Sequence, residues 1–197
     1  MIYIIRHGQT ILNKTKALQG RSDYPLTDAG IAEAEMAEQW FREHGITFSE
    51  VWSSPSVRAV QTAQIISGNE AAVQTDDRLL EMEYGPYEGT DLSSPPPEII
   101  TFFSDFVHNP APEGMEQLSD VVDRAGSFME ELKTAAPKGS ILISTHAILM
   151  KGILEYLTPG SGGSYWSRYL GNCAVYSTEI VKDAYTVPVE LKMYPEE

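Results

Sequence analysis

Two short apolar runs of this chain each end directly in a histidine, and this pairing limits the possible folds more than any other feature. Residues 2–7 read IYIIRH, and residues 141–146 read ILISTH. Runs of this length without polar alternation are typical of strands that are buried on both faces of a parallel sheet. Ligands of open α/β sheets bind beyond the carboxyl ends of the strands. We therefore expect His7 and His146 at one rim of the sheet.

Amphipathic stretches alternate with these runs, which predicts an α/β protein. Thr27, a residue suited to capping, precedes the first of these stretches, and Gly45 follows it. The pair Ser54–Pro55 precedes the second stretch. The predicted strands are 2–5, 51–52, 141–143 and two more near 173–180 and 186–192. The predicted helices are one capped by Thr27 and ending near His44, one beginning at Ser54–Pro55 and ending at Ile65–Ile66, and 115–132 and 148–157.

These elements predict a three-layer α/β/α fold with a mostly parallel central sheet, in a single domain spanning 1–197. The segment 90–113, TDLSSPPPEIITFFSDFVHNPAPE, interrupts the alternation. Its prolines break regular structure, and its aromatic residues suggest a short packed helix. We interpret it either as a lid-like insertion over the sheet edge or as an ordinary surface loop.

Two arginines add an anion-binding character to the expected rim. Arg6 precedes His7, and Arg58 lies in the first turn of the predicted helix after the strand at 51–52. A cation there opposes the helix dipole, so its natural partner is an anion bound in front of the helix. Guanidinium groups bind phosphate oxygens bidentately, and phosphoryl transfer depends mainly on positioning and charge neutralisation. The residues thus predict a phosphoryl site.

Chemistry at such a site needs a nucleophile and a proton donor. A neutral histidine can attack phosphorus, and nearby Arg6 helps to keep His7 uncharged. The leaving alcohol needs an acid, for which the loop RLLEMEYGPYEG offers Glu81, Glu83 and Glu88. Spacing alone does not choose among these three carboxylates.

In these residues and their order, the chain resembles the histidine phosphatase superfamily, which includes the phosphoglycerate mutases and short phosphatases such as α-ribazole phosphatase. Matching pieces occur in family order along nearly the whole chain. They are RHGQT (6–10), Asn13, QGRSDYPLTDAG (19–30), SSPSVRAVQTA (53–63), RLLEMEYGPYEG (78–89), PEGMEQLSDVVDRA (112–125) and STHAI (144–148).

The resemblance implies a phosphoglycerate mutase-like fold and roles for particular residues. His7 is the expected phosphorylated nucleophile, and Glu81 is the expected proton donor. Ala147 stands where the family usually has glycine, and its backbone N–H remains available. The residues expected to bind the phosphoryl group or substrate are Arg6, Asn13, Gln19, Gly20, Arg58, His146 and Ala147. The resemblance implies no metal and no cofactor.

The acidic stretch 79–123 bears on the substrate. It holds ten acidic residues and no lysine or arginine. A lid of that charge repels a second anionic group, so we expect a phosphomonoester whose leaving group is neutral, cationic or apolar. The alternatives are a phosphoglycerate mutase, a non-catalytic phospho-ligand binder and a metallohydrolase, which chelator sensitivity would reveal.

Composition and net charge limit the kinds of binding partner that we expect. The net charge of −14 argues against nucleic acid and against an anionic membrane surface, leaving a small phosphomonoester as the expected partner. One cysteine, Cys173, excludes a disulfide framework and a Cys-rich metal site. Without a secretion signal or a 20-residue apolar stretch, we expect a cytoplasmic protein. The oligomeric state is left open.

Overall fold

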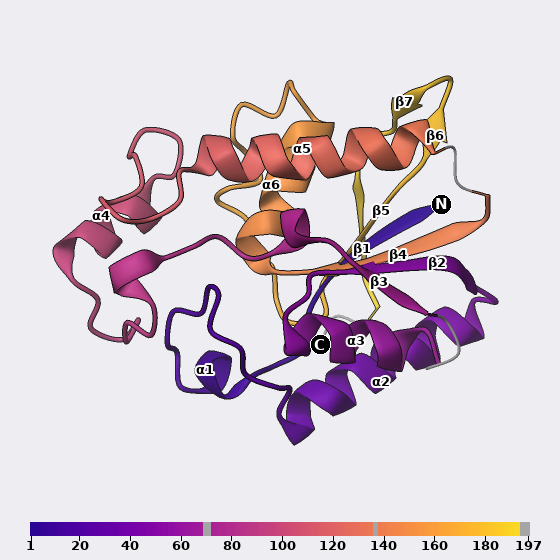
Figure 1. Ribbon diagram of the computed structural model, residues 1–197, viewed down its shortest axis with the longest axis horizontal. Helices are drawn as coiled ribbons and strands as arrows, with labels where there is room; N and C mark the ends of the chain where they lie inside the picture. Colours follow the sequence, from indigo (N-terminus) through magenta and orange to yellow (C-terminus); the bar gives the residue numbers. More distant parts are fainter. Residues whose placement is uncertain (69–71, 136–137, 194–197) are drawn as a thin grey trace.

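The computed structural model describes residues 1–68, 72–135 and 138–193. Within them, six strands form one mixed sheet in the order β3-β2-β4-β1-β5-β8 (Figure 1). The neighbours β3, β2, β4 and β1 run parallel, whereas β5 is antiparallel to both β1 and β8. This confirms the predicted mostly parallel sheet. The strands are β1 (Ile2–Arg6), β2 (Phe48–Ser53), β3 (Val73–Thr75), β4 (Ser140–Thr145), β5 (Val175–Thr178) and β8 (Val189–Leu191).

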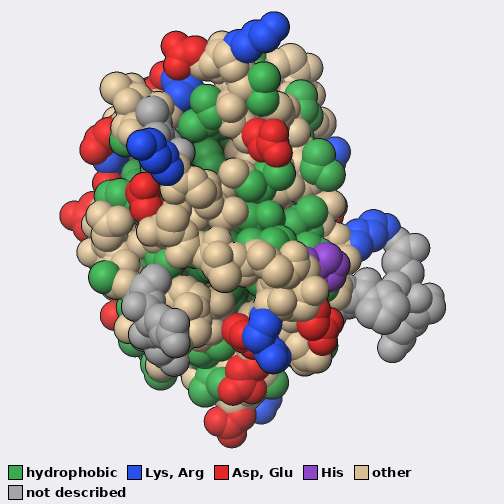
Figure 2. All heavy atoms as spheres, turned by 90° about the vertical axis from the view of Figure 1, so that its right-hand side faces the viewer, with side chains coloured by type: hydrophobic (Ala, Val, Ile, Leu, Met, Phe, Trp, Pro, Cys, Tyr) green, Lys and Arg blue, Asp and Glu red, His purple; other side chains and the backbone are tan. Residues whose placement is uncertain are grey.

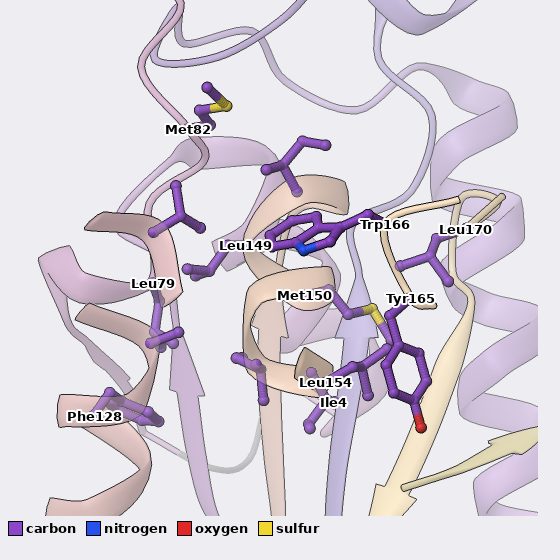
Figure 3. Close-up of a cluster of buried hydrophobic side chains, with 14 of the residues drawn as sticks. Ile4, Leu79, Met82, Phe128, Leu149, Met150, Leu154, Tyr165, Trp166 and Leu170 are labelled. Atoms are coloured by element: carbon purple, nitrogen blue, oxygen red, sulfur yellow. The ribbon is translucent and has the colours of Figure 1, made fainter. Parts of the chain in front are cut away.

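Helices cover both faces of the sheet, as Figure 1 shows: α2 and α3 lie on one side, α5 and α6 on the other. Strand β1 explains why both faces are needed, because all four of its apolar side chains are buried. Ile2 and Ile4 belong to one core cluster, whereas Tyr3 and Ile5 belong to the other. Figure 3 shows Ile4 in the first cluster, close to Leu154 of α6. The helices are α2 (Asp28–Glu43), α3 (Val57–Ile66), α5 (Leu118–Thr134) and α6 (Ala147–Leu157).

The capping signals of α2 are confirmed. Thr27 is the N-cap, and its hydroxyl accepts a hydrogen bond from the N–H of Gly30 at 3.1 Å. His44 is the C-cap, and Gly45 follows with a positive φ of 66°. Glycine adopts this left-handed conformation without the steric cost of a Cβ.

Two helix starts were predicted wrongly. Helix α3 begins at Val57 rather than at Ser54–Pro55, because the N–H of Ser54 still donates to the Ser144 carbonyl (3.0 Å) and continues the sheet. Helix α5 begins at Leu118 rather than at residue 115. There the N–H of Glu116 donates to the Glu83 carbonyl (2.9 Å), which ties the chain to the loop at 83 before the helix starts. Helix α6 begins at Ala147, one residue before the predicted start, and ends at Leu157 as predicted.

The C-terminal part also differs in detail. The strand predicted over 173–180 is β5, which ends at Thr178. A small hairpin of β6 (Ile180–Val181) and β7 (Ala184–Tyr185) follows, and its turn residues Lys182 and Asp183 have positive φ angles of 49° and 66°. Strand β8 lies within the predicted 186–192.

The segment 90–113 contains the predicted short helix, α4 (Pro97–Ser104), which buries Ile99 and Phe102. The interpretation of this segment as a lid-like insertion stays a prediction. Figure 1 shows α4 beyond the ends of the strands, at the same end of the molecule as α1 (Ile11–Lys14). Two short 3-10 helices, Asp77–Leu79 and Gly85–Tyr87, complete the described helical structure.

The opposite end of the molecule, with the N-terminus and the β6–β7 hairpin, faces the viewer in Figure 2. Basic side chains there stand apart from one another, among acidic ones. Among the described helices, none has the length and apolar character to cross a membrane.

Candidate functional site

The two histidine-ended strands are neighbours, as the sequence predicts. β1 and β4 pair in parallel, with Arg6 opposite Thr145, and the N–H of His7 donates to the Thr145 carbonyl (2.9 Å). The imidazole rings of His7 and His146 lie 5.1 Å apart between centroids. Both rings are almost fully buried, so the rim holds a pair of enclosed histidines.

The His7 ring is held in one tautomer. Its Nδ1 lies 2.7 Å from the Gly8 carbonyl oxygen, which only accepts, so Nδ1 carries the proton. Nε2 then keeps its lone pair and accepts from Nε of Arg58 at 3.3 Å. Burial, followed by the charges of Arg6 and Arg58, holds the pKa of His7 well below its usual range. His7 is therefore a neutral imidazole whose unprotonated nitrogen, Nε2, contacts Arg58.

Arg58 is completely buried and rigidly held. Its Nη2 donates to the Gly20 carbonyl at 2.6 Å, and its Nη1 donates to the Ser22 carbonyl at 2.8 Å. Burial lowers the pKa of Arg58, which the Glu81 charge partly offsets. The sequence analysis expected an anion in front of the first turn of α3. Asp23 fills part of this place, because its carboxylate accepts from the N–H of Val57 (2.8 Å).

Two polar atoms of the rim lack partners. Within the described chain, no protein atom bonds Nε of Arg6 or Nδ1 of His146, although both are buried. Arg6 is anchored elsewhere, because its Nη1 donates to the Leu170 carbonyl at 2.5 Å. An unsatisfied buried polar atom is costly, so these two atoms are candidates for contact with a ligand.

His146 is positioned by a residue that the sequence analysis missed. Its Nε2 lies 2.8 Å from Oγ of Ser54, which directly follows β2. Burial, and then the charge of Arg58, hold the pKa of His146 well below its usual range. Ser54 could have been found by the rule that located the histidines, because it also follows the carboxyl end of a strand.

The geometry separates the three candidate acids. Glu81 is buried, and its carboxylate accepts N–H bonds from Met82 (2.9 Å), Ile148 (3.1 Å) and Leu149 (3.0 Å). Glu83 is exposed and faces Arg21 at 3.9 Å, and Glu88 accepts from the N–H of Gly20 at 2.9 Å. Of the three, Glu81 alone lines the cavity beside His7.

That cavity has a volume of about 310 Å³. Asn13, Gln19 and Ala147 line it, as expected of substrate-binding residues. Oδ1 of Asn13 accepts from Nδ2 of Asn172 at 3.2 Å, which leaves the Asn13 amide N–H groups as donors. Gly20, also expected to bind substrate, is not part of the described lining; its carbonyl accepts from Nη2 of Arg58. The lining residues are Arg6, His7, Asn13, Ala17, Leu18, Gln19, Glu81, Tyr84, Leu92, Phe103, Ala147, Ile148, Lys151, Arg168, Tyr169 and Leu170.

A second cavity of about 580 Å³ adjoins the first. The two share four wall residues: Phe103, Lys151, Arg168 and Tyr169. The sequence analysis missed the last three, which come from α6 and from the connection 158–174 between α6 and β5. Lys151 had a detectable signal, because it lies four residues after Ala147 and shares its helix face.

Two residues of the acidic stretch 79–123 line the two cavities. Among the ten acidic residues of 79–123, Glu81 lines the first cavity and Asp105 the second. Others are engaged away from them; Glu116, for example, pairs with Arg124 at 2.6 Å. The neutral, cationic or apolar leaving group expected from this stretch stays a prediction. Within the described residues, no group of three or more His, Cys, Asp or Glu side chains is arranged to hold a metal ion.

The rim of this mostly parallel sheet thus holds a neutral histidine, His7, together with two buried polar atoms that have no partner in the described chain. The chain belongs to the histidine phosphatase superfamily (branch 1), whose model matches residues 2–189. A putative phosphoserine phosphatase 2 of Hydrogenobacter thermophilus is 30% identical over 186 residues, covering 91% of this chain and 88% of that protein. A probable phosphoglycerate mutase GpmB of Yersinia pestis is 30% identical over 179 residues, covering 88% and 82%.

Solved structures share the fold. Bacillus stearothermophilus YhfR superposes with a TM-score of 0.82 at 26% identity, covering 94% of each chain. A putative α-ribazole-5'-P phosphatase of Escherichia coli gives a TM-score of 0.83 at 24% identity, covering 98% of this chain and 96% of that one. These neighbours confirm the predicted phosphoglycerate mutase-like architecture.

Proposed function

We propose that this protein is a phosphatase that hydrolyses small phosphomonoesters through a phosphohistidine on Nε2 of His7. One observation carries the proposal: the Nδ1 contact with the Gly8 carbonyl leaves Nε2 unprotonated. The orphaned Nε of Arg6 and Nδ1 of His146 supply donors for phosphoryl oxygens in front of it. The relatives include both phosphatases and mutases by name, which supports phosphoryl chemistry of this type.

The reaction has two steps. Nε2 of His7 attacks phosphorus as the bond to the ester oxygen breaks, and Glu81 gives its proton to the leaving alcohol. Water then attacks the phosphohistidine, Glu81 takes a proton from that water, and inorganic phosphate leaves with His7 restored. Arg6, Arg58 and His146 balance the charge on the phosphoryl oxygens in both steps. Neither step requires a metal ion.

The leaving group predicted from the acidic stretch 79–123, which is neutral, cationic or apolar, stays part of this proposal. A phosphoglycerate mutase would use the same first step. It differs in returning the phosphoryl group to a second substrate oxygen instead of to water. Release of inorganic phosphate separates the two reactions.

The test is hydrolysis of p-nitrophenyl phosphate between pH 5 and 7.5 with EDTA present, comparing wild type with His7→Ala. We expect turnover by the wild type and none by the variant. Acid-labile phosphate on His7, trapped by rapid quenching, would identify the intermediate. Activity that is lost when EDTA is present would support the alternative of a metallohydrolase. Interconversion of phosphoglycerates that depends on bisphosphoglycerate and exceeds hydrolysis would make the protein a mutase. Binding without either reaction would make it a phospho-ligand binder.

A further inference from the structure

We propose that Glu88 is a positioning residue for the phosphoryl transfer, which holds Arg58 against the nucleophile through a short loop. The inference deepens the proposed function and rests on it for the reaction. The loop consists of residues 20–22 and lies between the Glu88 carboxylate and the Arg58 guanidinium. Glu88 itself is not part of the described lining of the cavity beside His7, so it acts through Arg58 and not on the substrate.

The Glu88 carboxylate binds the loop at two of its residues. Oε1 accepts from the N–H of Gly20 (2.9 Å), from the N–H of Ser22 (3.3 Å) and from the Ser22 hydroxyl. Oε2 accepts from the N–H of Gly20 at 3.0 Å. Hydrogen bonds to an ionised acceptor are stronger than those between neutral groups. Because the loop belongs to no helix or strand, this carboxylate supplies partners that regular structure would otherwise supply.

The backbone around Glu88 is itself fixed to the chain that precedes the loop. The N–H of Gly89 donates to the Leu18 carbonyl, and the N–H of Leu18 donates to the Thr90 carbonyl, both at 2.8 Å. These bonds join the segment after Glu88 to the segment before Gly20. The carboxylate therefore holds the loop from a fixed position.

Position 20 has no room for a side chain beside this carboxylate. A Cβ on Gly20 would lie 2.7 Å from Oε2 of Glu88 and 2.6 Å from the Met82 carbonyl oxygen. Glycine lets another group approach the backbone closely. The bare backbone at Gly20 thus allows Glu88 to reach the N–H directly.

The same two loop residues bind Arg58 with their carbonyl groups. The Gly20 carbonyl accepts from Nη2 at 2.6 Å, and the Ser22 carbonyl accepts from Nη1 at 2.8 Å. Each residue thus donates its N–H to the carboxylate and offers its C=O to the guanidinium. The orientation of the buried guanidinium therefore depends on a loop that Glu88 holds.

The charge of Glu88 supports this arrangement. Burial lowers the pKa of Arg58. Three carboxylates oppose that change: Glu81, Asp23 and Glu88. The ion pairs of the described chain do not include Arg58, so these charges act on it without direct contact. Glu88 thus supplies both a hold on the loop and a counter-charge, which suitable variants can separate.

The final contact joins Arg58 to the nucleophile. Nε of Arg58 donates at 3.3 Å to Nε2 of His7, the atom proposed to attack phosphorus. The guanidinium is a planar fork whose donors have fixed directions, so a displaced loop turns the whole group. Small errors in the position of a catalytic group are costly to the rate. Loss of Glu88 should therefore slow the reaction although every group that touches the substrate is still present.

Variants of Glu88 separate contact from charge. Glu88→Gln loses the charge but keeps an acceptor oxygen, whereas Glu88→Asp keeps the charge on a shorter side chain that does not reach the loop. We expect Glu88→Asp and Glu88→Ala to lower kcat/KM for p-nitrophenyl phosphate about tenfold, the scale of one charge-assisted hydrogen bond, and Glu88→Gln to stay within about threefold of the wild type. Full activity of Glu88→Asp together with a large loss in Glu88→Gln would overturn the positioning role.

A double-variant cycle tests whether Glu88 acts through Arg58. Arg58→Lys removes the fork that the loop positions. In that background, Glu88→Ala should lower kcat/KM by less than about twofold, whereas the effects of independent sites add in free energy. A loss as large as in the wild-type background would overturn the proposal, and damage to stability alone would give that result. Glu88→Asp takes the place of Glu88→Ala in the cycle if the alanine variant does not fold.

The imidazole nitrogen resonances report the same contact without catalysis. Nε2 of His7 accepts a hydrogen bond from Arg58, and its resonance should move downfield when that bond is lost. We expect this shift in Glu88→Ala and Glu88→Asp. Glu83→Ala is the matched control, because the exposed Glu83 carboxylate faces Arg21 of the same loop at 3.9 Å. Exposed ion pairs contribute little, so this variant should change neither the resonance nor kcat/KM. An unchanged resonance in Glu88→Ala would overturn the proposal.

The positioning role and the phosphatase reaction fail independently in this design. If the wild type hydrolyses p-nitrophenyl phosphate and both Glu88→Ala and Glu88→Asp match it, the proposed function stands and the positioning role falls. If the wild type shows no hydrolysis while the His7 resonance still responds to Glu88→Ala, the contact through Arg58 stands and the phosphatase proposal falls.

Discussion

Oγ of Ser54 lies 2.8 Å from Nε2 of His146, so the residue after β2 orients the residue after β4. Neutral imidazole carries one N–H. The Ser54 hydroxyl has two possible acceptors, Oγ of Ser56 (3.3 Å) and the closer Nε2 of His146; when it donates to Nε2, the His146 N–H is on Nδ1, which has no protein partner in the described chain. This tautomer presents a donor to a phosphoryl oxygen.

Ser54→Ala should therefore lower kcat about tenfold and the free energy of unfolding by about 1–3 kcal/mol, because it leaves Nε2 of His146 unpaired. Steady-state kinetics and urea denaturation measure the two effects. Ser144→Ala is the matched control: its buried hydroxyl donates to the Ala59 carbonyl at 2.8 Å and does not touch His146. It should cost stability but little activity. Equal losses of kcat in both variants would remove the orienting role of Ser54.

Arg58→Lys should reduce kcat/KM for p-nitrophenyl phosphate by roughly 10²-fold, the order expected for one preorganised donor of a charged transition state. Lysine keeps the charge but cannot bond the Gly20 carbonyl, the Ser22 carbonyl and His7 at once. Arg42→Lys, at an exposed ion pair with Glu38, is the control. Retention of wild-type kcat/KM in Arg58→Lys would show that charge alone suffices.

Stability should fall on acidification below pH 6.5. Burial holds the pKa values of His7 and His146 well below 6.5, so between 6.5 and those lowered values the unfolded chain binds protons that the folded chain does not. Each histidine contributes a slope of about 1.4 kcal/mol per pH unit. Urea denaturation at pH 7.5, 6.5 and 5.5 should show the change below 6.5, and His146→Gln should reduce that slope by about half. An unchanged slope in the variant would contradict the assignment.

Gly30→Ala should displace the backbone that positions His7. A Cβ on Gly30 would lie 2.1 Å from the Gln9 carbonyl oxygen, a backbone atom next to Gly8. Since Gly8 holds Nδ1 of His7, we expect a stability loss of about 1–3 kcal/mol with reduced kcat. At Gly160 a Cβ meets no atom within 4 Å, so Gly160→Ala is the control and should change neither quantity appreciably. Thermal unfolding and initial rates measure both variants.

The positions of His7 and His146 could be predicted from the sequence, because each residue directly follows a strand and ligands bind beyond the carboxyl ends of parallel strands. Once the strands containing Ile4 and Ile143 are recognised, His7 and His146 follow at one rim. The starts of α3 and α5 were predicted wrongly because tertiary hydrogen bonds of Ser54 and Glu116 compete with the helix.

The sequence analysis missed Lys151, Arg168 and Tyr169, which line both cavities, for a different reason. Arg168 comes from an irregular connection whose position depends on Trp166 and Leu170 packing against α6. The substrate prediction drawn from the acidic stretch stays a prediction, because net charge along the chain does not say which way each carboxylate faces.

The central place of β1 affects how the chain is made. Its partners on either side are β4 and β5, so Ile2 pairs with Ile141 and with Thr178. During synthesis the first strand therefore waits with both edges open until most of the chain has emerged. Pairings between such distant residues fold slowly, and unpaired apolar strands are prone to associate with other chains. Yield in a cell should consequently depend on chaperones and on growth temperature more than the stability of the finished protein suggests.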